Sequence, residues 1–290
     1  MKLSSRTSHL HLIRKHYKNW VVFIVAYVLG KETTDAVTRS GFVVRTNLTN
    51  LMGLAHLEDA GWQIRAVSAD FLTITSPYQD VTLRCRLLVG GDVAHLDEIF
   101  RRRVYGGNFE GKVVLDIGMS NADSSIFFVK NGAELVIGIE PFPASFDLAE
   151  QNISLNHLAK KVIPVNAALA SFSDSKSLFV SSTQPNFSSL QPLPGAKSLV
   201  KFDSSTPVRT ITIPDLKLRY KLEKIDVLKL DCEGCEYDIL GQNLVVDDIS
   251  EIFVEFHGEG SPIRNFLSDN GYAIKQIENN ILHASRGKAE

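Results

Sequence analysis

The chain has 290 residues, and its content of 44% hydrophobic and 22% charged residues is ordinary for a globular protein. The formal net charge of −2 argues against a general nucleic-acid binder, which normally carries a basic surplus. The three cysteines, Cys85, Cys232 and Cys235, are too few for a secreted disulfide scaffold, so we expect a reducing, cytoplasmic location.

The N-terminal segment is basic and His-rich over residues 1–18, and an apolar run follows over residues 20–29. This run is too short to span a bilayer. Basic residues before an apolar run also fit the core of a signal peptide, but no small-x-small cleavage site follows Gly30. We therefore expect a helix packed on the body of the protein. Contact with a membrane surface through residues 1–30 is the alternative.

Residues 1–107 form the first predicted region, in which helical pattern precedes short strands. A helix over residues 93–103 closes this region, and residues 105–108 are typical of a turn. The short strands are expected at residues 42–45, 63–68, 71–75 and 81–88.

Residues 108–290 form the second predicted region, in which apolar runs alternate with helical pattern. Near-continuous runs of Val, Ile and Leu are typical of parallel strands that are buried on both faces. Their alternation with helices indicates an α/β fold with a doubly wound sheet. A hairpin of residues 272–277 and 281–284 is expected near the end. The parallel strands are expected at residues 113–117, 135–139, 162–168, 225–230 and 251–256.

Residues 181–207 are rich in Ser, Pro and Gly and interrupt this alternation. A long loop within a compact domain is usually functional or disordered. The stretch fits a segment that covers a substrate, and it fits a plain surface insertion equally well.

An Asp-x-Gly sequence ends the first of these strands, at Asp116 and Gly118, and Met119 and Ser120 follow in the loop. Glycine lets the backbone turn sharply and approach a ligand closely. The G-x-G-x-x-G pattern of a dinucleotide site is absent. The loop therefore fits either a nucleoside-type cofactor or an ordinary structural turn.

Glu140 ends the next strand and precedes Pro141. A carboxylate at this place can accept two hydrogen bonds from the paired hydroxyls of a ribose. Its position about one βα unit after Asp116 favours that role over the role of a helix N-cap acid. At the third strand, Asn166 and Ala167 leave room for a flat purine, although small core residues explain them equally well.

Three carboxylates, those of Asp231, Glu233 and Glu236, crowd the end of the fourth strand. Ligands of open α/β sheets bind outside the carboxyl ends of the strands, where Asp231 would offset the charge of a cationic cofactor. Glu233 and Glu236 fit a substrate, a metal or the first turn of a helix. Cys232 and Cys235 lack the second pair of a structural zinc site. A redox pair is possible, but the thioredoxin-type context is absent, so we expect packing or incidental thiols.

The fifth strand ends in Glu255 and His257, two positions apart and hence on one side of the strand. Histidine is the natural general base near neutral pH, and His257 together with Asp231 could also hold a metal ion. A satisfied polar residue is the plain alternative. Three strand ends with such residues in one sheet favour a functional site.

These residues together resemble the FkbM-type S-adenosylmethionine-dependent methyltransferases. The resemblance covers roughly residues 81–290, and the Asp-x-Glu-Gly-x-Glu run is its most specific part. The motifs that carry it are Val-Leu-Asp116-Ile-Gly118, Ile-Gly-Ile-Glu140-Pro-Phe-Pro, Leu-Lys-Leu-Asp231-Cys-Glu233-Gly234-Cys-Glu236 and Val-Glu255-Phe-His257.

The resemblance implies a Rossmann-like class I methyltransferase fold of seven mostly parallel strands with an antiparallel terminal hairpin. It implies S-adenosylmethionine as the methyl donor, Asp231 at the cofactor or substrate hydroxyl, and His257 as the base. We assign no metal ligands. The residues expected to bind the cofactor are Asp116, Gly118, Met119, Ser120, Glu140, Pro141, Asn166 and Ala167.

The loop after the first strand departs from the family pattern Asp-x-Gly-Ala-Asn-x-Gly, because Met119 replaces a small residue and Ala122 replaces the second glycine. Alanine can serve where close helix packing is needed, but it serves poorly where a positive φ is required. We predict an O-methyltransferase that acts on a hydroxyl of a sugar, glycan or small metabolite. The alternative is a non-catalytic module of this fold that binds a partner or a glycan.

Overall fold

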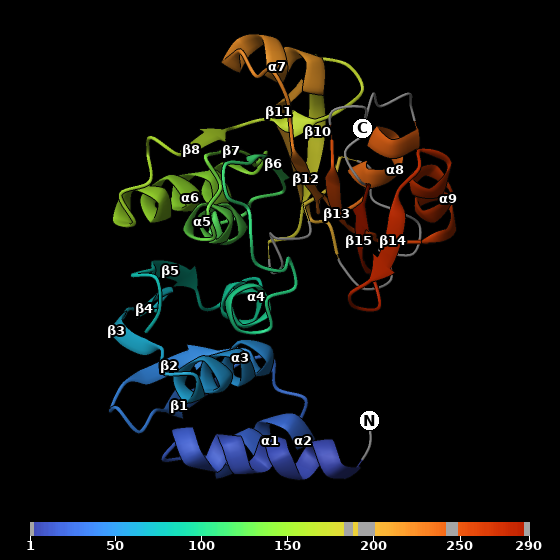
Figure 1. Ribbon diagram of the computed structural model, residues 1–290. Coiled ribbons are helices and arrows are strands. Elements are labelled where there is room, and N and C mark those ends of the chain that lie inside the picture. Colours follow the sequence, from blue (N-terminus) through green and yellow to red (C-terminus); the bar gives the residue numbers. More distant parts are fainter. Residues whose placement is uncertain (1–2, 183–187, 191–200, 242–248, 287–290) are drawn as a thin grey trace. The chain divides into compact units, whose positions relative to one another are not determined.

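The computed structural model describes residues 3–182, 188–190, 201–241 and 249–286. The chain divides into two compact units, Met1–Arg103 and Val104–Glu290 (Figure 1). In the part of the chain that is described, no helix is both long enough and apolar enough to cross a membrane.

The first unit combines helices with two small antiparallel sheets. Helix α3 (Leu48–Asp59) begins at Asn47, whose side chain accepts a hydrogen bond of 2.8 Å from the backbone N–H of Asn50. Such a cap satisfies an N–H group that has no partner within the helix. The other elements are α1 (Leu3–His16), α2 (Val21–Val28), the hairpin of β1 (Thr34–Val37) and β2 (Val43–Thr46), and the sheet of β3 (Gln63–Val67), β4 (Phe71–Thr75) and β5 (Thr82–Arg86).

Two features of this unit differ from the prediction. Strand β1 lies where the sequence predicts no strand, because its four residues carry little apolar pattern and gain their place by pairing with β2. The helix predicted over residues 93–103 is α4 (Asp92–Leu96), which continues as the π-helical turn η1 (Asp97–Arg101).

The second unit is built on a seven-stranded sheet in the order β14-β15-β13-β12-β6-β7-β8. Strands β6, β7, β8, β12 and β13 are parallel, whereas β15 runs antiparallel to both of its neighbours. The predicted fold class is confirmed. The strands are β6 (Val113–Ile117), β7 (Leu135–Ile139), β8 (Val162–Val165), β12 (Val227–Leu230), β13 (Glu251–Glu255), β14 (Ala273–Gln276) and β15 (Ile281–Ser285).

A second, three-stranded sheet of this unit lies in and beside the predicted insertion. The strand predicted over residues 162–168 is shorter in the structure, where β8 ends at Val165. The following strand β9 (Ala168–Leu169) belongs to the small sheet with β10 (Ser175–Val180) and β11 (Ser204–Ile211). Residues 204–207, predicted as loop, are therefore strand. Residues 183–187 and 191–200 of the predicted insertion lie outside the described residues.

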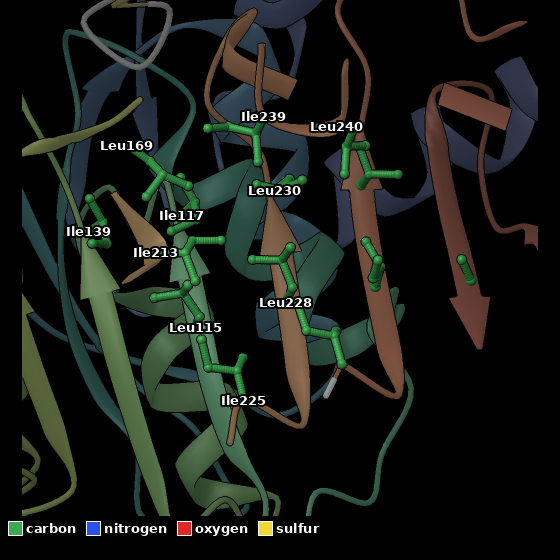
Figure 2. Packing of buried hydrophobic residues seen from close by; sticks show 14 of the residues in the cluster. Leu115, Ile117, Ile139, Leu169, Ile213, Ile225, Leu228, Leu230, Ile239 and Leu240 are labelled. Carbon is green, nitrogen blue, oxygen red and sulfur yellow. The ribbon is translucent and has the colours of Figure 1, made fainter. Parts of the chain in front are cut away.

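One face of the large sheet carries the aliphatic core that Figure 2 shows. Alternate residues of the strands, such as Leu115, Ile117, Leu228 and Leu230, point to this face and are fully buried. Helices α7 (Ile213–Tyr220), α8 (Cys235–Gly241) and α9 (Ser261–Asp269) contribute to the same core through Ile213, Leu216, Ile239, Leu240, Ile263 and Leu267.

The opposite face combines aromatic side chains with a row of polar ones. Helix α5 (Asp123–Lys130) contributes Phe127 and Phe128, whose rings pack with Tyr105 and Phe109. Cross-strand register places Gly138, Asp116, Lys229 and Phe253 side by side on four neighbouring strands. Helix α6 (Pro143–Leu155) follows β7. The polar members of this row lie next to the carboxyl edge of the sheet.

The strand order reverses at β6, because β7 and β8 extend the sheet on one side and β12 and β13 on the other. Ligands of open α/β sheets bind outside the carboxyl ends of the strands at such a switch point. The loops after β6, β7, β12 and β13 therefore lie where a ligand of this sheet would bind.

Candidate functional site

The loop after β6 lies against the end of β12 through Gly118. Its backbone has a φ of +76°, and a Cβ atom at this position would lie 1.7 Å from the carbonyl oxygen of Asp231. The N–H groups of Gly118 and Met119 both donate to the carbonyl of Ile139 on the other side. Only glycine fits between the two strand ends, because any side chain at this position would collide with the backbone of Asp231.

Met119 and Ala122, the two departures from the family pattern, are both accommodated. The Met119 side chain is fully buried, and its sulfur occupies the space beside Gly138 of β7 that a Cβ would otherwise fill. Ala122 adopts a φ of +67°, the left-handed conformation in which a glycine would be unstrained. The loop thus keeps a sharp turn into α5, and Met119 offers a ligand only its backbone.

Asp116 is fully buried, and its carboxylate binds other parts of the protein. Oδ2 accepts hydrogen bonds from the hydroxyls of Ser124 (2.7 Å) and Ser125 (2.6 Å) at the start of α5. Oδ1 lies 3.2 Å from Nζ of Lys229. The structure places Asp116 behind the loop as the residue that joins β6, α5 and β12.

Lys229 is the ion-pair partner that holds this arrangement together, and sequence reasoning missed it. Its Nζ donates to the carbonyl of Gly118 at 2.7 Å and lies 3.4 Å from Oδ2 of Asp231. Burial lowers the pKa of Lys229, but attraction to Asp116 and Asp231 outweighs this effect and raises the pKa well above its ordinary value. A lysine within a buried apolar strand was the available signal, because an unpaired charge there is costly.

Glu140, at the end of β7, binds the loop after β6. Its Oε2 accepts the N–H of Ser120 at 3.0 Å, and its Oε1 accepts the N–H of Phe142 at 2.8 Å. Each carboxylate oxygen can accept more than one hydrogen bond. The predicted ribose-binding acid is therefore held in a fixed orientation beside Ser120.

Asn166 links the ends of β7 and β8. Its side-chain amide donates to the carbonyls of Glu140 (2.9 Å) and Pro141 (3.3 Å). Ala167 is buried, and Pro141 is half-buried. The structure thus brings the predicted residues of three neighbouring strand ends to one edge of the sheet.

The turn between β12 and α8 is organised by Glu236, whose side chain is fully buried. Its Oε2 accepts the N–H of Gly234 at 2.7 Å, and its Oε1 accepts the N–H of Cys232 at 3.3 Å. The turn brings the Cα atoms of Cys232 and Cys235 to 5.5 Å, and a disulfide joins them. The prediction of packing thiols was wrong, because two positive-φ residues, Glu233 and Gly234, fold the chain back between the cysteines.

His257 follows β13 and faces the same turn. Its Nδ1 lies 2.8 Å from Oε1 of Glu236, which orients the ring. Its Nε2 lies 3.3 Å from Oε2 of Glu233 and 3.9 Å from Oδ1 of Asp231. The structure thus brings both predicted catalytic residues, His257 and Asp231, together and adds Glu233 and Glu236, which were predicted only as alternatives.

The acidic surroundings favour the protonated form of His257. Burial lowers its pKa, but the hydrogen bond to Glu236 and the charges of Glu233, Glu236 and Asp231 raise it to about 10. Burial raises the pKa of Glu233 to about 8, against the lowering effect of His257. Near pH 7 His257 is therefore an imidazolium, and Glu233 carries its proton. The Glu233–His257 pair can accept a proton only after it has released one.

The same donor atoms have the spacing of a cation site. Ligand atoms of Asp231, Glu233 and His257 all lie within 4.8 Å of one another. Carboxylate oxygens and an imidazole nitrogen suit several divalent metals. The proton on His257 already supplies a positive charge among these carboxylates, and the expectation of no metal stays a prediction.

Replacing Glu236 by glutamine is expected to lower the pKa of His257 by about one to two pH units, because the variant loses a buried negative charge beside the ring. The titration of the His257 ring protons by NMR measures this value directly. Glu259→Gln, which removes an exposed carboxylate two residues after His257, is the matched control and should leave the titration unchanged. Equal pKa values in wild type and Glu236→Gln would contradict this account of the site.

Several solved methyltransferase structures are similar to this chain. TrmK from M. capricolum, solved with S-adenosylhomocysteine, is 12% identical with a TM-score of 0.38, and the match covers 66% of this chain and 66% of that protein. An FkbM methyltransferase from Methylobacillus flagellatus KT is 13% identical with a TM-score of 0.40 and is covered over 47% of its length by 66% of this chain. A precorrin-6y C5,15-methyltransferase from Geobacter metallireducens GS-15 is 14% identical with a TM-score of 0.40, and the match covers 69% and 91% of the two chains.

The sequence itself identifies the family. No curated protein matches the chain. The family model described as the methyltransferase FkbM domain matches residues 116–274, which is more than half of the chain and includes the loops after β6, β7, β12 and β13. The chain therefore belongs to the FkbM methyltransferase family, whose methyl donor is S-adenosylmethionine.

Proposed function

We propose that this methyltransferase transfers the methyl group to a hydroxyl of a sugar, glycan or small metabolite at the carboxyl edge of the large sheet. The observation that carries the proposal is the convergence of Asp231, Glu233 and His257 beside the Gly118 loop. Hydroxyl groups are poor nucleophiles at neutral pH, so their methylation benefits from a nearby proton acceptor.

The residues present fit the cofactor. Glu140 is held at the end of β7, which is the position of a ribose-binding acid, and the absence of a side chain at Gly118 keeps the loop close to the end of β12. When bound, S-adenosylmethionine supplies a methyl group on a positively charged sulfur. Asp231, which is 30% exposed at the strand end, provides a negative charge that favours such a cation.

The protein contributes positioning and proton transfer. Glu236 holds His257 through Nδ1, so that Nε2 faces Glu233 and Asp231. We assign the Glu233–His257 pair as the group that takes the proton from the acceptor hydroxyl. The acceptor oxygen freed of its proton would then receive the methyl group, with the electron pair of the carbon–sulfur bond left on sulfur.

Ser189, within the predicted insertion, supports a role of this segment in binding the methyl acceptor. The hydroxyl of Ser189 donates to the carbonyl of Glu233 at 2.5 Å, and Ser189 also pairs with Phe179 of β10. This segment therefore fixes the backbone of a residue assigned to proton transfer. We propose that the small sheet of β9, β10 and β11 contributes to acceptor binding.

The alternative of a non-catalytic module was based on the two substitutions in the loop after β6, and both are accommodated by the fold. Met119 packs beside Gly138, and Ala122 takes the backbone conformation of the glycine it replaces.

Glu140→Gln is expected to weaken the binding of S-adenosylmethionine by roughly tenfold to a hundredfold, because a hydrogen-bonded carboxylate at a ribose contributes about 1.5–3 kcal/mol. Isothermal titration calorimetry measures the affinity. Glu134→Gln, at an exposed position just before β7, should bind as wild type does. A dideoxyribose analogue of S-adenosylhomocysteine should bind both glutamine variants equally well, because it lacks the hydroxyls. Undiminished binding of S-adenosylmethionine by Glu140→Gln, or no binding by wild type, would count against the site.

The rate of methyl transfer is expected to rise with pH and level off above about pH 8, because Glu233 keeps its proton below its pKa of about 8. Below that value the rate should fall about tenfold for each pH unit. Glu233→Gln should remove this dependence together with most of the activity. The measurement is kcat against pH with saturating cofactor. A flat wild-type profile between about pH 6 and pH 9 would exclude the pair as the proton acceptor.

A further inference from the structure

We propose that helix α2 of the first unit docks this protein onto a membrane surface that contains anionic lipids. Helix α2 buries only Phe23 and Ala26, which face the rest of the unit, and the Phe23 ring packs 4.6 Å from that of Tyr17. The methyltransferase site needs none of these residues. The proposal therefore stands apart from the activity proposed above.

The exposed side of α2 is almost entirely apolar. Seven of the 15 large hydrophobic side chains that are exposed in the described part of the chain lie within residues 21–29. The others are spread over the sequence, such as Leu88, Leu155 and Leu218, and single exposed residues of this kind need no partner. The seven are Val21, Val22, Ile24, Val25, Tyr27, Val28 and Leu29, with exposures from 38% to 73%.

Charge identifies the occupant of this apolar surface. Residues 1–31 contain six Lys and Arg and no Asp or Glu, a formal charge of +6, whereas the whole chain carries −2, so the rest carries −8. Exposed basic side chains lie at both ends of α2, with Arg14 and Lys18 before it and Lys31 after it. The Arg14 guanidinium lies 5.1 Å from the centre of the Trp20 ring, directly before the helix. Apolar residues between basic ones are the pattern of interfacial helices on anionic lipids.

The length of α2 decides how it would bind. Its eight residues extend about 12 Å, against a hydrocarbon thickness of about 30 Å, so it can lie in the interface but cannot cross it. A second copy of this chain is a poor occupant, because the exposed basic side chains of Arg14, Lys18 and Lys31 would face the same charges on the other copy. An anionic lipid surface matches both the apolar side chains and the flanking charges.

Sedimentation of the 290-residue protein with large vesicles tests this proposal. Wild type should bind vesicles of phosphatidylcholine with about one-third phosphatidylglycerol at least about tenfold more tightly than vesicles of phosphatidylcholine alone. The double variant Val25→Glu, Val28→Glu should lose at least about tenfold of this binding, because two charges enter the apolar surface. Arg14→Glu with Lys18→Glu should weaken binding to anionic vesicles only.

Leu218→Glu is the matched control, since Leu218 is a highly exposed leucine on a helix of the second unit. It should bind vesicles as wild type does. The variants keep Phe23 and Ala26, the buried residues of α2, so each is expected to fold. Thermal melts check that it does. Absence of wild-type binding, or equal binding by the Val25→Glu, Val28→Glu variant, would overturn the proposal. If wild type is a dimer in the absence of vesicles and the Val25→Glu, Val28→Glu variant is a monomer, the surface belongs instead to a contact with a second copy.

Discussion

Gly118→Ala is expected to destabilise the second unit by more than about 3 kcal/mol and to reduce methyl transfer at least about a hundredfold. The added Cβ would lie 1.7 Å from the carbonyl oxygen of Asp231, which is backbone and cannot rotate away. The ends of β6 and β12 must therefore separate, and Asp231 moves with its strand. The left-handed φ of +76° adds about 1–2 kcal/mol of strain for any residue with a side chain.

Gly106→Ala separates these two causes. Gly106 belongs to the same unit and has a φ of +78°, but a Cβ there would meet no atom within 4 Å. It should therefore cost only the strain of about 1–2 kcal/mol and leave cofactor affinity unchanged. Urea unfolding and calorimetry with S-adenosylhomocysteine measure both effects. Equal losses in the two variants would show that the contact between the β6 loop and β12 has no special role.

Lys229→Met is expected to destabilise the protein by about 3–5 kcal/mol, because it leaves the carboxylate of Asp116 charged and buried without its cation. Two serine hydroxyls remain on the other carboxylate oxygen, and they do not replace a positive charge. The variant also loses the hydrogen bond from Nζ to the carbonyl of Gly118, so the loop after β6 loosens. Affinity for S-adenosylmethionine should fall together with stability.

Lys224→Met is the control for this prediction. Lys224 forms an ion pair of 2.7 Å with Asp226, but its side chain is 58% exposed, so its loss should cost less than about 1 kcal/mol. The double variant Lys229→Met, Asp116→Asn removes both buried charges and should regain part of the lost stability. Unfolding in urea measures all three variants. A loss in Lys229→Met no larger than in Lys224→Met would refute the structural role of the buried pair.

Most of the large sheet could be predicted from local sequence. The runs Val113–Ile117 and Leu135–Ile139 are strands with the predicted bounds, because a strand buried on both faces needs a continuous apolar run. The hairpin of β10 and β11 could not be predicted in this way. Exposed positions alternate with only a few buried ones in these two strands. The residues that pair, 175–180 with 204–209, are far apart in the sequence. Such pairing depends on the surroundings more than on local pattern.

The candidate site shows the same division. Strand-end position was enough to place Glu140, Asp231 and His257 at one edge of the sheet, because parallel strands bring their carboxyl ends together. The role of Glu236 required the structure, since a first-turn acid of a helix has a sufficient local explanation. The burial of Asp116 behind its loop likewise depends on Lys229 from a strand more than 100 residues away.

A crystal structure of this protein with S-adenosylhomocysteine would show where the cofactor lies among the loops after β6, β7, β12 and β13. We expect the ribose hydroxyls at the Glu140 carboxylate and the sulfur on the side of Asp231, with the Gly118 loop against the ligand. We also expect a cavity beyond the sulfur that includes Glu233 and His257. A nucleoside bound away from Glu140, or a sulfur that faces away from Asp231 and His257, would contradict this placement of the cofactor.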